Sequence, residues 1–429
     1  MSRLVLATFG SLGDLHPILA LAYELRRRQH TVVIATSEIY REKISTLGFL
    51  FAPLRPEIST VDEAMVRRIM DGTGGTEYLL RELMLPAVRD MHADLIRATT
   101  GADLLVTNEL VYAAPLLSEQ TGLRWVSYSL APISYFSAHD PCIPPMPGGG
   151  EWVHACPPFV VRAMNRCAAW LTYSWWQPVR AFRRELRLRP GGNPLFAGKH
   201  SPLLDLALFS PLLQPPQADW SPQTQQTGFC FYDENETSVS HEPSLAPLPP
   251  AIEHFLAGGE PPIVFTLGSA AVYAANDFYV ESARAAQLLG RRALLLLGKN
   301  PPPPDLPSTV LTCDYLPYAH IFPSAAAIVH QGGVGTTAQA LRAGRPMLIV
   351  PFAHDQFDNA ARIARLGSGR TLSRRHYTAV TAQRTLASLL ADHRATELAA
   401  EFRSRIQTES GVISACDALE RALVHPRNK

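Results

Sequence analysis

The sequence predicts an α/β protein made of two doubly wound, Rossmann-like domains that face one another across a cleft. A chain of 429 residues is too long for one ordinary hydrophobic core, so two domains are expected. In each half, short apolar runs alternate with segments of helical spacing, which is typical of a parallel sheet covered on both faces. A proline-rich tract from Pro243 to Pro262 separates the halves. We expect domains over residues 1–240 and 262–405, a linker over 241–261, and a final helix over 406–429 that returns to the first domain.

The elements of the first half follow in order. Residues 4–9 predict a strand, and the turn "ATFGSLGDLHP" follows it, with a helix over 18–28. Residues 31–36, 103–107 and 125–129 predict three more strands. Residues 141–158 are rich in proline and glycine and lack the alternation of strands and helices. The aromatic run 170–178 follows them. These last segments predict either a flexible surface loop or a lid over an apolar ligand.

The second half repeats the pattern. Residues 262–269, 292–298, 325–333 and 346–352 each read as a strand followed by a turn, and the chain becomes helical from Thr396 onwards. Open parallel sheets bind ligands in the crevice beyond the carboxyl ends of their strands. The polar motifs that follow these strands are therefore candidates for the functional site.

Composition excludes several classes of protein. The chain is 47% hydrophobic and 18% charged with a formal net charge of +1, so it lacks the basic surface that nucleic-acid binding requires. Six scattered cysteines without a C-x-x-C pair predict neither a zinc site nor a disulfide framework, and they favour a cytoplasmic location. The sequence shows no signal-peptide pattern and no run of about 20 apolar residues. Peripheral contact with a membrane and the oligomeric state are left open by composition.

The most informative stretch, residues 328–363, begins with a glycine-rich turn. Gly332, Gly333 and Gly335 lie between a strand and a helix expected near Thr336, where backbone N–H groups favour an anion. His330 at the strand end adds a donor. This combination suits a diphosphate held without a metal ion. The alternative is a tight strand–helix turn with a capping threonine.

The next strand ends in a second polar group, "HDQFDN". Asp355 and Gln356 stand side by side before another helix, where a carboxylate and an amide can bind neighbouring hydroxyls of a sugar. Asn359 lies one turn further on and faces the glycine turn. An isolated aspartate here would more often cap a helix, but beside an anion-binding turn the sugar-binding interpretation is favoured.

These motifs resemble the nucleotide-sugar signature of the inverting natural-product glycosyltransferases, which have the GT-B fold. The resemblance spans nearly the whole chain, from "GSLGDLHP" through "TLGS" to "HDQFDN". Among bacterial members the sequence looks similar to the second-chain rhamnosyltransferases of rhamnolipid synthesis and to related sterol or flavonoid glycosyltransferases. The resemblance implies an acceptor-binding N-terminal domain, a C-terminal domain for the nucleotide sugar as co-substrate, and no further cofactor or metal.

The resemblance also implies roles for individual residues. The segment "YLPYAHIF" matches the one that binds the nucleobase, with Tyr315 stacking on the base and the main chain of Tyr318 at the base edge. Ser269 matches a phosphate contact. The other matching positions bind the diphosphate or the sugar, or belong to the N-terminal turn. They complete the donor-binding set implied by the resemblance: Gly13, His330, Gly332, Gly333, Gly335, Thr336, Asp355, Gln356 and Asn359.

One departure from the family pattern bears on the donor. Many relatives carry a glutamate eight residues after the histidine, where it binds the ribose hydroxyls, and this chain has Ala338 there. A deoxyribose donor loses less by this change than a ribose donor. We therefore favour a dTDP-sugar, dTDP-rhamnose in particular, over UDP-glucose.

The stereochemical outcome and the catalytic base are also inferred from the resemblance. Retaining enzymes of this fold carry paired glutamates in the donor domain, and residues 282–396 contain no glutamate, which favours inversion.

Inversion requires a base from the other domain. Asp14 stands at the matching position, directly after the second glycine of the turn, and at neutral pH an ordinary aspartate is ionised. His16 is the rival because its usual pKa suits base catalysis better. Where relatives use a histidine base, an aspartate orients it, and Asn108 at that position favours Asp14.

Two simpler interpretations of this turn were weighed. Asp14 could merely cap a helix that begins at Pro17. Gly10 and Gly13 do not complete the G-x-G-x-x-G pattern of a dinucleotide fold, so a nicotinamide enzyme is disfavoured.

The acceptor is the least determined part of the prediction. Residues 61–84, the loop after 127–136 and the aromatic run 170–176 are candidate contacts, and their apolar content suggests a small hydrophobic acceptor such as a hydroxy fatty acid, a sterol or terpenoid, or a flavonoid. Each aromatic residue could equally belong to the core. Two other functions share the architecture: a sugar-nucleotide epimerase and a non-catalytic nucleotide-sugar-binding protein.

Overall fold

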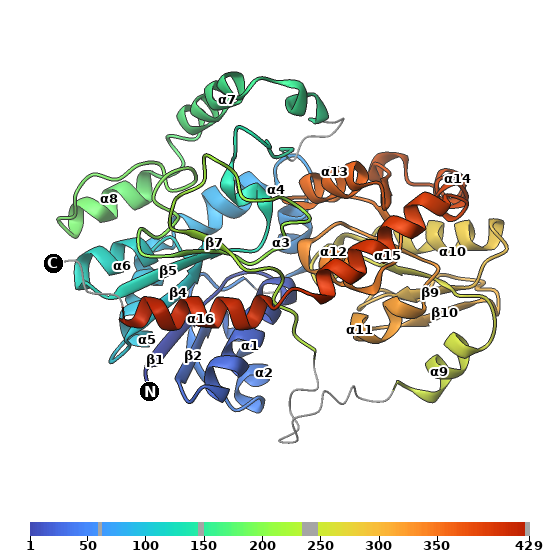
Figure 1. Ribbon diagram of the computed structural model, residues 1–429, viewed down its shortest axis with the longest axis horizontal. Coiled ribbons are helices and arrows are strands. Elements are labelled where there is room, and N and C mark those ends of the chain that lie inside the picture. The colour runs from blue at the N-terminus through green and yellow to red at the C-terminus, as the bar shows by residue number, and fades with distance from the viewer. Residues whose placement is uncertain (59–61, 145–149, 234–247, 425–429) are drawn as a thin grey trace.

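The computed structural model describes residues 1–58, 62–144, 150–233 and 248–424. Within them the chain forms two α/β halves that lie side by side, each with helices on both faces of a parallel sheet (Figure 1). The two-domain, Rossmann-like prediction is confirmed.

The first sheet has seven strands in the order β3-β2-β1-β4-β5-β6-β7, all parallel. Successive side chains of a strand point to opposite faces. Leu4 and Leu6 therefore pack under α1 and α16, whereas Val5 and Ala7 pack on the other face. The strands are β1 (Arg3–Ala7), β2 (Thr31–Thr36), β3 (Leu50–Pro53), β4 (Leu104–Asn108), β5 (Arg124–Ser129), β6 (Asp205–Ala207) and β7 (Thr224–Gln226).

The helices of this half are α1 (Leu12–Arg27), α2 (Arg41–Thr46), α3 (Glu63–Ile69), α4 (Gly75–Glu77), α5 (Val88–Ala98), α6 (Ala114–Thr121), α7 (Pro158–Leu171) and α8 (Gln177–Glu185). Shorter helical turns are η1 (Glu38–Tyr40), the π-helix η2 (Tyr78–Met84), η3 (Pro132–Tyr135) and η4 (Glu151–Ala155).

The second sheet has six parallel strands in the order β10-β9-β8-β11-β12-β13. They are β8 (Ile263–Thr266), β9 (Ala293–Leu296), β10 (Val310–Cys313), β11 (Ala327–His330), β12 (Met347–Ile349) and β13 (Gly369–Thr371). The helices are α9 (Pro250–Ala257), α10 (Phe278–Leu288), α11 (Tyr318–Ile321), α12 (Val334–Ala343), α13 (Gln356–Leu366), α14 (Ala379–Leu390) and α15 (His393–Gln407), with η5 (Ala271–Ala274), η6 (Phe322–Ser324) and η7 (Arg374–His376).

The last helix, α16 (Gly411–Val424), leaves the second half and packs against α1 and β5 of the first (Figure 1). Gly411 stands at the crossing, where a β-carbon would lie 2.2 Å from the carbonyl oxygen of Phe229. Arg28 fixes α16 to α1 through Asp417 (2.6 Å) and Glu420 (2.7 Å). The chain thus ties its two halves together at the C-terminal end.

The first helix begins earlier than the sequence analysis placed it. It starts at Leu12 and not at Ile18, and its N-cap is Ser11, so the idea that Asp14 caps a helix beginning at Pro17 is wrong. Pro17 is the sixth residue of this helix, and because proline has no N–H it gives the carbonyl of Gly13 no i→i−4 hydrogen bond. Asp14 and His16 therefore lie on the helix and not in the turn before it.

Several other elements differ from expectation. Strands β3, β6, β7, β10 and β13 were not predicted, because each is only three or four residues long and all but β3 contain polar residues or glycine. The expected helical stretch 61–84 is divided into α3, α4 and η2, and residue 61 lies outside the described residues. The expected linker contains α9, whereas its residues 241–247 lie outside the described part. Among the described residues, no helix has the length and apolar character needed to cross a membrane.

Candidate active site

Two helix N-termini, one from each half, meet at the center of the molecule. The first turn of α1 comes so close to the first turn of α12 that a β-carbon on Gly335 would lie 3.6 Å from the Cα of Gly13. Because both helices follow strands at the carboxyl ends of their sheets, this contact is where ligands of such folds bind. The turn with Asp14 and the glycine-rich turn are thus neighbours.

Asp14 is held in place by its own turn. It occupies the third position of α1 and completes a capping box, in which the Ser11 N–H donates to Asp14 Oδ2 (2.8 Å) and the Gly13 N–H donates to Ser11 Oγ (3.3 Å). Gly10 has φ +132°, and a β-carbon there would lie 2.1 Å from Asp14 Oδ2. Glycine at position 10 therefore makes room for the carboxyl group.

The electrostatic setting of Asp14 suits a base that works near neutrality. Burial raises its pKa to about 7, and the negative charge of Asp355 across the contact adds to the rise, while the Ser11 N–H opposes it. A carboxylate with this pKa binds a proton far better than an ordinary aspartate.

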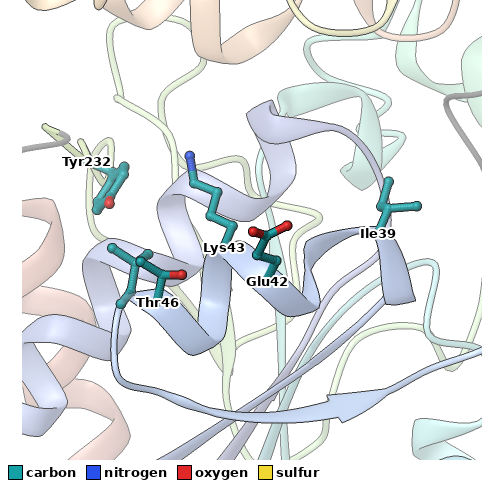
Figure 2. Close-up of a pocket in the computed structure, with 6 residues that line it drawn as sticks. Ile39, Glu42, Lys43, Thr46 and Tyr232 are labelled. Carbon is teal, nitrogen blue, oxygen red and sulfur yellow. The ribbon is translucent and has the colours of Figure 1, made fainter.

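His16 lies elsewhere. Residues two apart on a helix point about 200° away from each other. The ring of His16 packs 5.1 Å from that of Tyr232, and its Nε2 is buried without a hydrogen-bond partner in the described chain. Burial, with a contribution from Lys43, lowers its pKa to about 3. Tyr232 and Lys43 line a shallow hollow over α2 (Figure 2).

His330 ends β11 as a neutral donor. Its Nδ1 accepts from the Gly332 N–H (3.0 Å), so the ring proton is on Nε2. Burial lowers its pKa to about 3, and Nε2 has no partner among the described residues. A buried N–H donor without a partner is costly unless a ligand satisfies it.

The glycine-rich turn opens α12 without a side-chain cap. Its N-cap is Gly333, so the first-turn N–H groups are available for an anion, apart from that of Val334, which donates to Asp355 Oδ2 (3.2 Å). Gly332 has φ +90°. Gln331 was not predicted as part of the site, yet its amide fills the space over this turn: a β-carbon on Gly268 or Gly333 would lie 2.4 or 2.8 Å from its Nε2.

The aspartate and glutamine of the second strand are fixed by different partners. Asp355 Oδ2 also accepts from Asn359 Nδ2 (2.7 Å), and burial raises the Asp355 pKa to about 6. Gln356 Oε1 accepts from the N–H groups of Phe352 (2.8 Å) and Ala353 (3.1 Å), which leaves its amide N–H groups for another acceptor. Asn359 is fully buried and also donates to the Gly332 carbonyl (2.9 Å), so it braces α13 against the glycine-rich turn.

The residues expected at the nucleobase follow β10, and α11, which begins at Tyr318, contacts α12. Tyr315 exposes 47% of its surface, whereas Tyr318 is turned inward, with its hydroxyl 2.9 Å from Thr266 Oγ1 and its ring stacked on Phe322 at 4.4 Å. Ser269 lies in the turn after β8, and Thr336 is buried in the first turn of α12.

An ion pair beside the site was missed by the sequence analysis. Asn108 donates to the carbonyl of Phe9 (2.9 Å), whereas Glu109 is paired with Lys199 (2.9 Å) and accepts from Ser134 Oγ (2.6 Å). Burial works to raise the Glu109 pKa, but the Lys199 charge and these hydrogen bonds outweigh it and hold the pKa below its usual value. The two partners are 90 residues apart, so no local pattern reveals them.

A buried cluster joins the two halves next to α13. Arg362 is almost fully buried and pairs with Asp358 (2.7 Å) and with Asp140 of the loop after β5. Asp358 also accepts from the Ile143 N–H (2.9 Å), and Arg365 reaches Asp140 at 3.0 Å. The loop after β5 is therefore fastened to the helix that carries Gln356. In the described ranges, no group of three or more His, Cys, Asp or Glu side chains is arranged to hold a metal ion.

Solved structures of similar shape identify the fold. The glycotransferase of kitacinnamycin superposes with a TM-score of 0.74 at 20% identity, over 98% of this chain and 99% of that one. The spinosyn rhamnosyltransferase SpnG complexed with thymidine diphosphate gives a TM-score of 0.67 at 17% identity, over 97% and 100% of the two chains. The fold is thus GT-B, as predicted.

Sequence comparison identifies the family. Residues 4–94 match the glycosyltransferase family 28 N-terminal domain, and residues 298–413 match the C-terminal domain of the erythromycin biosynthesis protein CIII-like family. The O-mycaminosyltylonolide 6-deoxyallosyltransferase of Streptomyces fradiae is 31% identical over 97% of both chains. The sterol 3-beta-glucosyltransferase UGT80B1 of Arabidopsis thaliana is 25% identical over 98% of this chain and 68% of its own length. The protein belongs to the family of natural-product glycosyltransferases with the GT-B fold and is a transferase.

This membership confirms the predicted natural-product glycosyltransferase family. It favours a transferase over the epimerase and the non-catalytic binding protein that the sequence analysis also considered. The expected closeness to rhamnosyltransferases of the rhamnolipid type stays a prediction.

Proposed function

We propose that the enzyme moves a sugar from a nucleoside-diphosphate donor to a hydroxyl of a small hydrophobic acceptor, with inversion, without a metal ion, and with Asp14 as the base. The observation that carries the proposal is the contact between the Asp14 turn and the glycine-rich turn at Gly13 and Gly335. It brings a carboxyl group whose pKa is raised to about 7 next to a set of anion-binding N–H groups.

In the proposed reaction, the acceptor oxygen forms a bond to the anomeric carbon while the bond from that carbon to the diphosphate oxygen breaks. Asp14 takes the hydroxyl proton as it is released. The Nε2–H of His330 and the first-turn N–H groups of α12 stabilise the negative charge that develops on the leaving diphosphate. Attack from the face opposite the leaving group inverts the anomeric configuration.

Asp355 and Gln356 are proposed to bind the sugar hydroxyls. Asp355 Oδ2 is occupied by Val334 and Asn359, so its other oxygen is the one offered to the sugar. Gln356 offers its amide N–H groups, because its carbonyl oxygen is bound to the backbone. Tyr315 is proposed as the platform for the nucleobase, since its ring is half exposed beside β10.

For the donor, we favour dTDP-rhamnose, with UDP-glucose as the alternative. Ala338 is buried on α12 and has no group to bind a ribose hydroxyl. SpnG, which shares the fold, was solved with thymidine diphosphate. Turnover with the dTDP-sugar and with UDP-glucose, measured as released nucleoside diphosphate, tests this preference, and a strong preference for UDP-glucose would reverse it.

For the acceptor, the relatives support a small apolar molecule. One of them is named for transfer to O-mycaminosyltylonolide and another for transfer to a sterol. A hydroxy fatty acid ester, a sterol or terpenoid, and a flavonoid are therefore the classes to try.

The test of the whole proposal is acceptor-dependent turnover. The enzyme is incubated with each donor and a panel of hydrophobic alcohols, and we expect nucleoside diphosphate to appear only when a suitable acceptor is present. Donor isomerisation without an acceptor, or donor binding without turnover throughout the panel, would contradict it. Asp14→Asn and His16→Ala identify the base: if only the histidine variant loses transfer while it still binds dTDP, the assignment to Asp14 is wrong.

A further inference from the structure

Helix α7 carries large apolar side chains on its outer surface. Phe159 exposes 70% of its surface, Trp170 74% and Leu171 64%, and Trp152 in the preceding turn η4 exposes 56%. Within α7, all of which the structure describes, Val161 is the fully buried residue. In Figure 1 the helix lies at the outer edge of the first half, away from the two sheets. A soluble protein rarely exposes so many large apolar side chains on one short segment without a partner.

Phe159 and Trp170 form one stripe along the helix, whereas Leu171 lies about 100° around the helix from Trp170 and Trp152 precedes the helix. Phe159, Ala163 and Trp170 are spaced by four and seven residues, which places them on one face. Arg166 lies on the same face, between the two rings, and Arg162 lies beside this face; both arginines are exposed. The opposite face is the one that holds the helix to the protein.

The attachment of that inner face is specific. Val161 packs with Ala138 and Val153, and Asn165 Nδ2 donates to the carbonyl of Phe136 (2.8 Å). The orientation of α7 is thus fixed, and the apolar stripe points outward because the inner contacts are satisfied.

The same region concentrates positive charge. Residues 151–200 contain eight Arg or Lys and two Asp or Glu, although the whole chain contains 39 and 38. Further exposed arginines are Arg184 near the end of α8 and Arg187 and Arg189 after it. The near-neutral chain therefore carries a strongly basic segment around its most apolar surface.

We propose that this aromatic–basic face, formed by Trp152, Phe159, Trp170 and Leu171 with Arg162 and Arg166, docks the enzyme on an anionic lipid bilayer. An apolar stripe rich in aromatic residues and flanked by arginines is the pattern of helices that lie in the membrane interface. The guanidinium groups pair with lipid phosphates while the rings enter the headgroup region.

The dimensions agree with docking on the surface and not with insertion across it. A helix of 14 residues is about 21 Å long, whereas the hydrocarbon core of a bilayer is about 30 Å thick. A second copy of the chain is a poorer occupant, because two identical basic faces would repel one another. The docking does not depend on the proposed donor or acceptor, so its test measures binding and not transfer.

The experiment is vesicle flotation of the full-length protein, with phosphatidylcholine vesicles that contain or lack about one third phosphatidylglycerol, at low and at high salt. We expect binding to the anionic vesicles, weakened by salt. Phe159→Ser/Trp170→Ser should lower the partition coefficient at least tenfold, since buried apolar area is lost. Arg162→Glu/Arg166→Glu should lower it at least twentyfold, because each basic residue near an anionic surface contributes roughly a factor of five.

Matched variants elsewhere control for hydrophobicity and net charge. Leu288→Ser/Val380→Ser removes two exposed apolar side chains of the second half, and Arg375→Glu/Arg384→Glu makes the same charge change there. Both should bind as the wild type does, and all variants should keep the wild-type melting temperature. The proposal is overturned by absence of binding to anionic vesicles, by equal losses in the controls, or by a wild-type dimer that Phe159→Ser/Trp170→Ser dissociates without any vesicle binding.

Discussion

Replacing Asp14 by asparagine should make the enzyme inactive and, at alkaline pH, more stable. The side chain keeps its shape, and the amide oxygen can still accept the Ser11 N–H that now binds Oδ2 at 2.8 Å. What disappears is a buried negative charge. The variant therefore measures separately the stability that is lost by burying the carboxylate and the activity that depends on it.

The magnitude follows from the pKa of the carboxyl group, which is raised from 3.8 to about 7 by burial first and by the charge of Asp355 in addition. A folded-state pKa above the unfolded one means that stability is present in acid and is lost as pH rises from about 4 to about 7. The full shift corresponds to about 4 kcal/mol at roughly 1.36 kcal/mol per unit. Because the side chain retains some contact with solvent, we expect about half of that.

The assay is a pair of urea titrations at about pH 5 and pH 8, together with transfer rates at both values. Asp14→Asn should gain about 2 kcal/mol over the wild type at pH 8 and less at pH 5, while kcat falls by 10²- to 10⁴-fold. In the wild type, kcat/KM should rise with pH and level off above about 7. Asp277→Asn, which makes the same chemical change at an exposed site, should alter stability by less than about 0.5 kcal/mol.

Two outcomes would refute the reasoning. Wild-type turnover in Asp14→Asn would show that another group takes the proton. An unchanged stability difference between pH 5 and pH 8 would show that the carboxyl group is not buried as the structure has it.

The remaining predictions concern the surroundings of this group. Gly10→Ala should abolish transfer although the carboxyl group remains, because the new β-carbon would lie 2.1 Å from Asp14 Oδ2, and dTDP binding by calorimetry should persist if the protein folds. His330→Ala should weaken dTDP binding roughly 10- to 100-fold, since a hydrogen bond to a charged group is worth about 1.5–3 kcal/mol; an unchanged Kd contradicts its role. Asp140→Ala should lower the free energy of unfolding by about 3 kcal/mol, because it removes a partner of the buried Arg362, and urea titration measures the loss.

Much of the fold could be predicted from local sequence alone. The strand expected at residues 31–36 is β2 with the same bounds, and the strand expected at 125–129 is β5 with one more residue. Both are mostly apolar or aromatic and lie inside a parallel sheet, where burial on both faces favours such residues. The polar motifs at Gly332 and Asp355 were found for the same reason, since they directly follow such runs.

The contacts within the site could not be predicted in this way. Gln331 fills the space over two glycine turns that are 65 positions apart, Gly268 and Gly333, and the Glu109–Lys199 pair joins distant loops. Such contacts depend on the tertiary arrangement, and no spacing in the sequence specifies them. Gly333 was interpreted as part of an anion-binding turn, whereas the absence of a side chain there also accommodates Gln331.

The start of α1 is an error that the sequence could have corrected. Pro17 suggested a helix start because proline is favoured in a first turn. However, Ser11 followed three residues later by an acid is itself a start signal, and the structure uses it. With the helix begun at Leu12, its periodicity alone separates Asp14 from His16 by about 200°. Where the helix begins therefore places the two candidates on different sides of α1.

That start also explains how the Asp14 carboxyl group can cap the helix and still serve in its proposed role as the base. The hydrogen bonds that Asp14 makes within the described residues all go to Oδ2, from the Ser11 N–H and hydroxyl. This leaves Oδ1 for the acceptor proton. The capping bonds fix the direction of the side chain, and the absence of a side chain at Gly10 leaves room for it. Capping thus orients the base, and the burial that comes with this position raises its pKa toward neutrality.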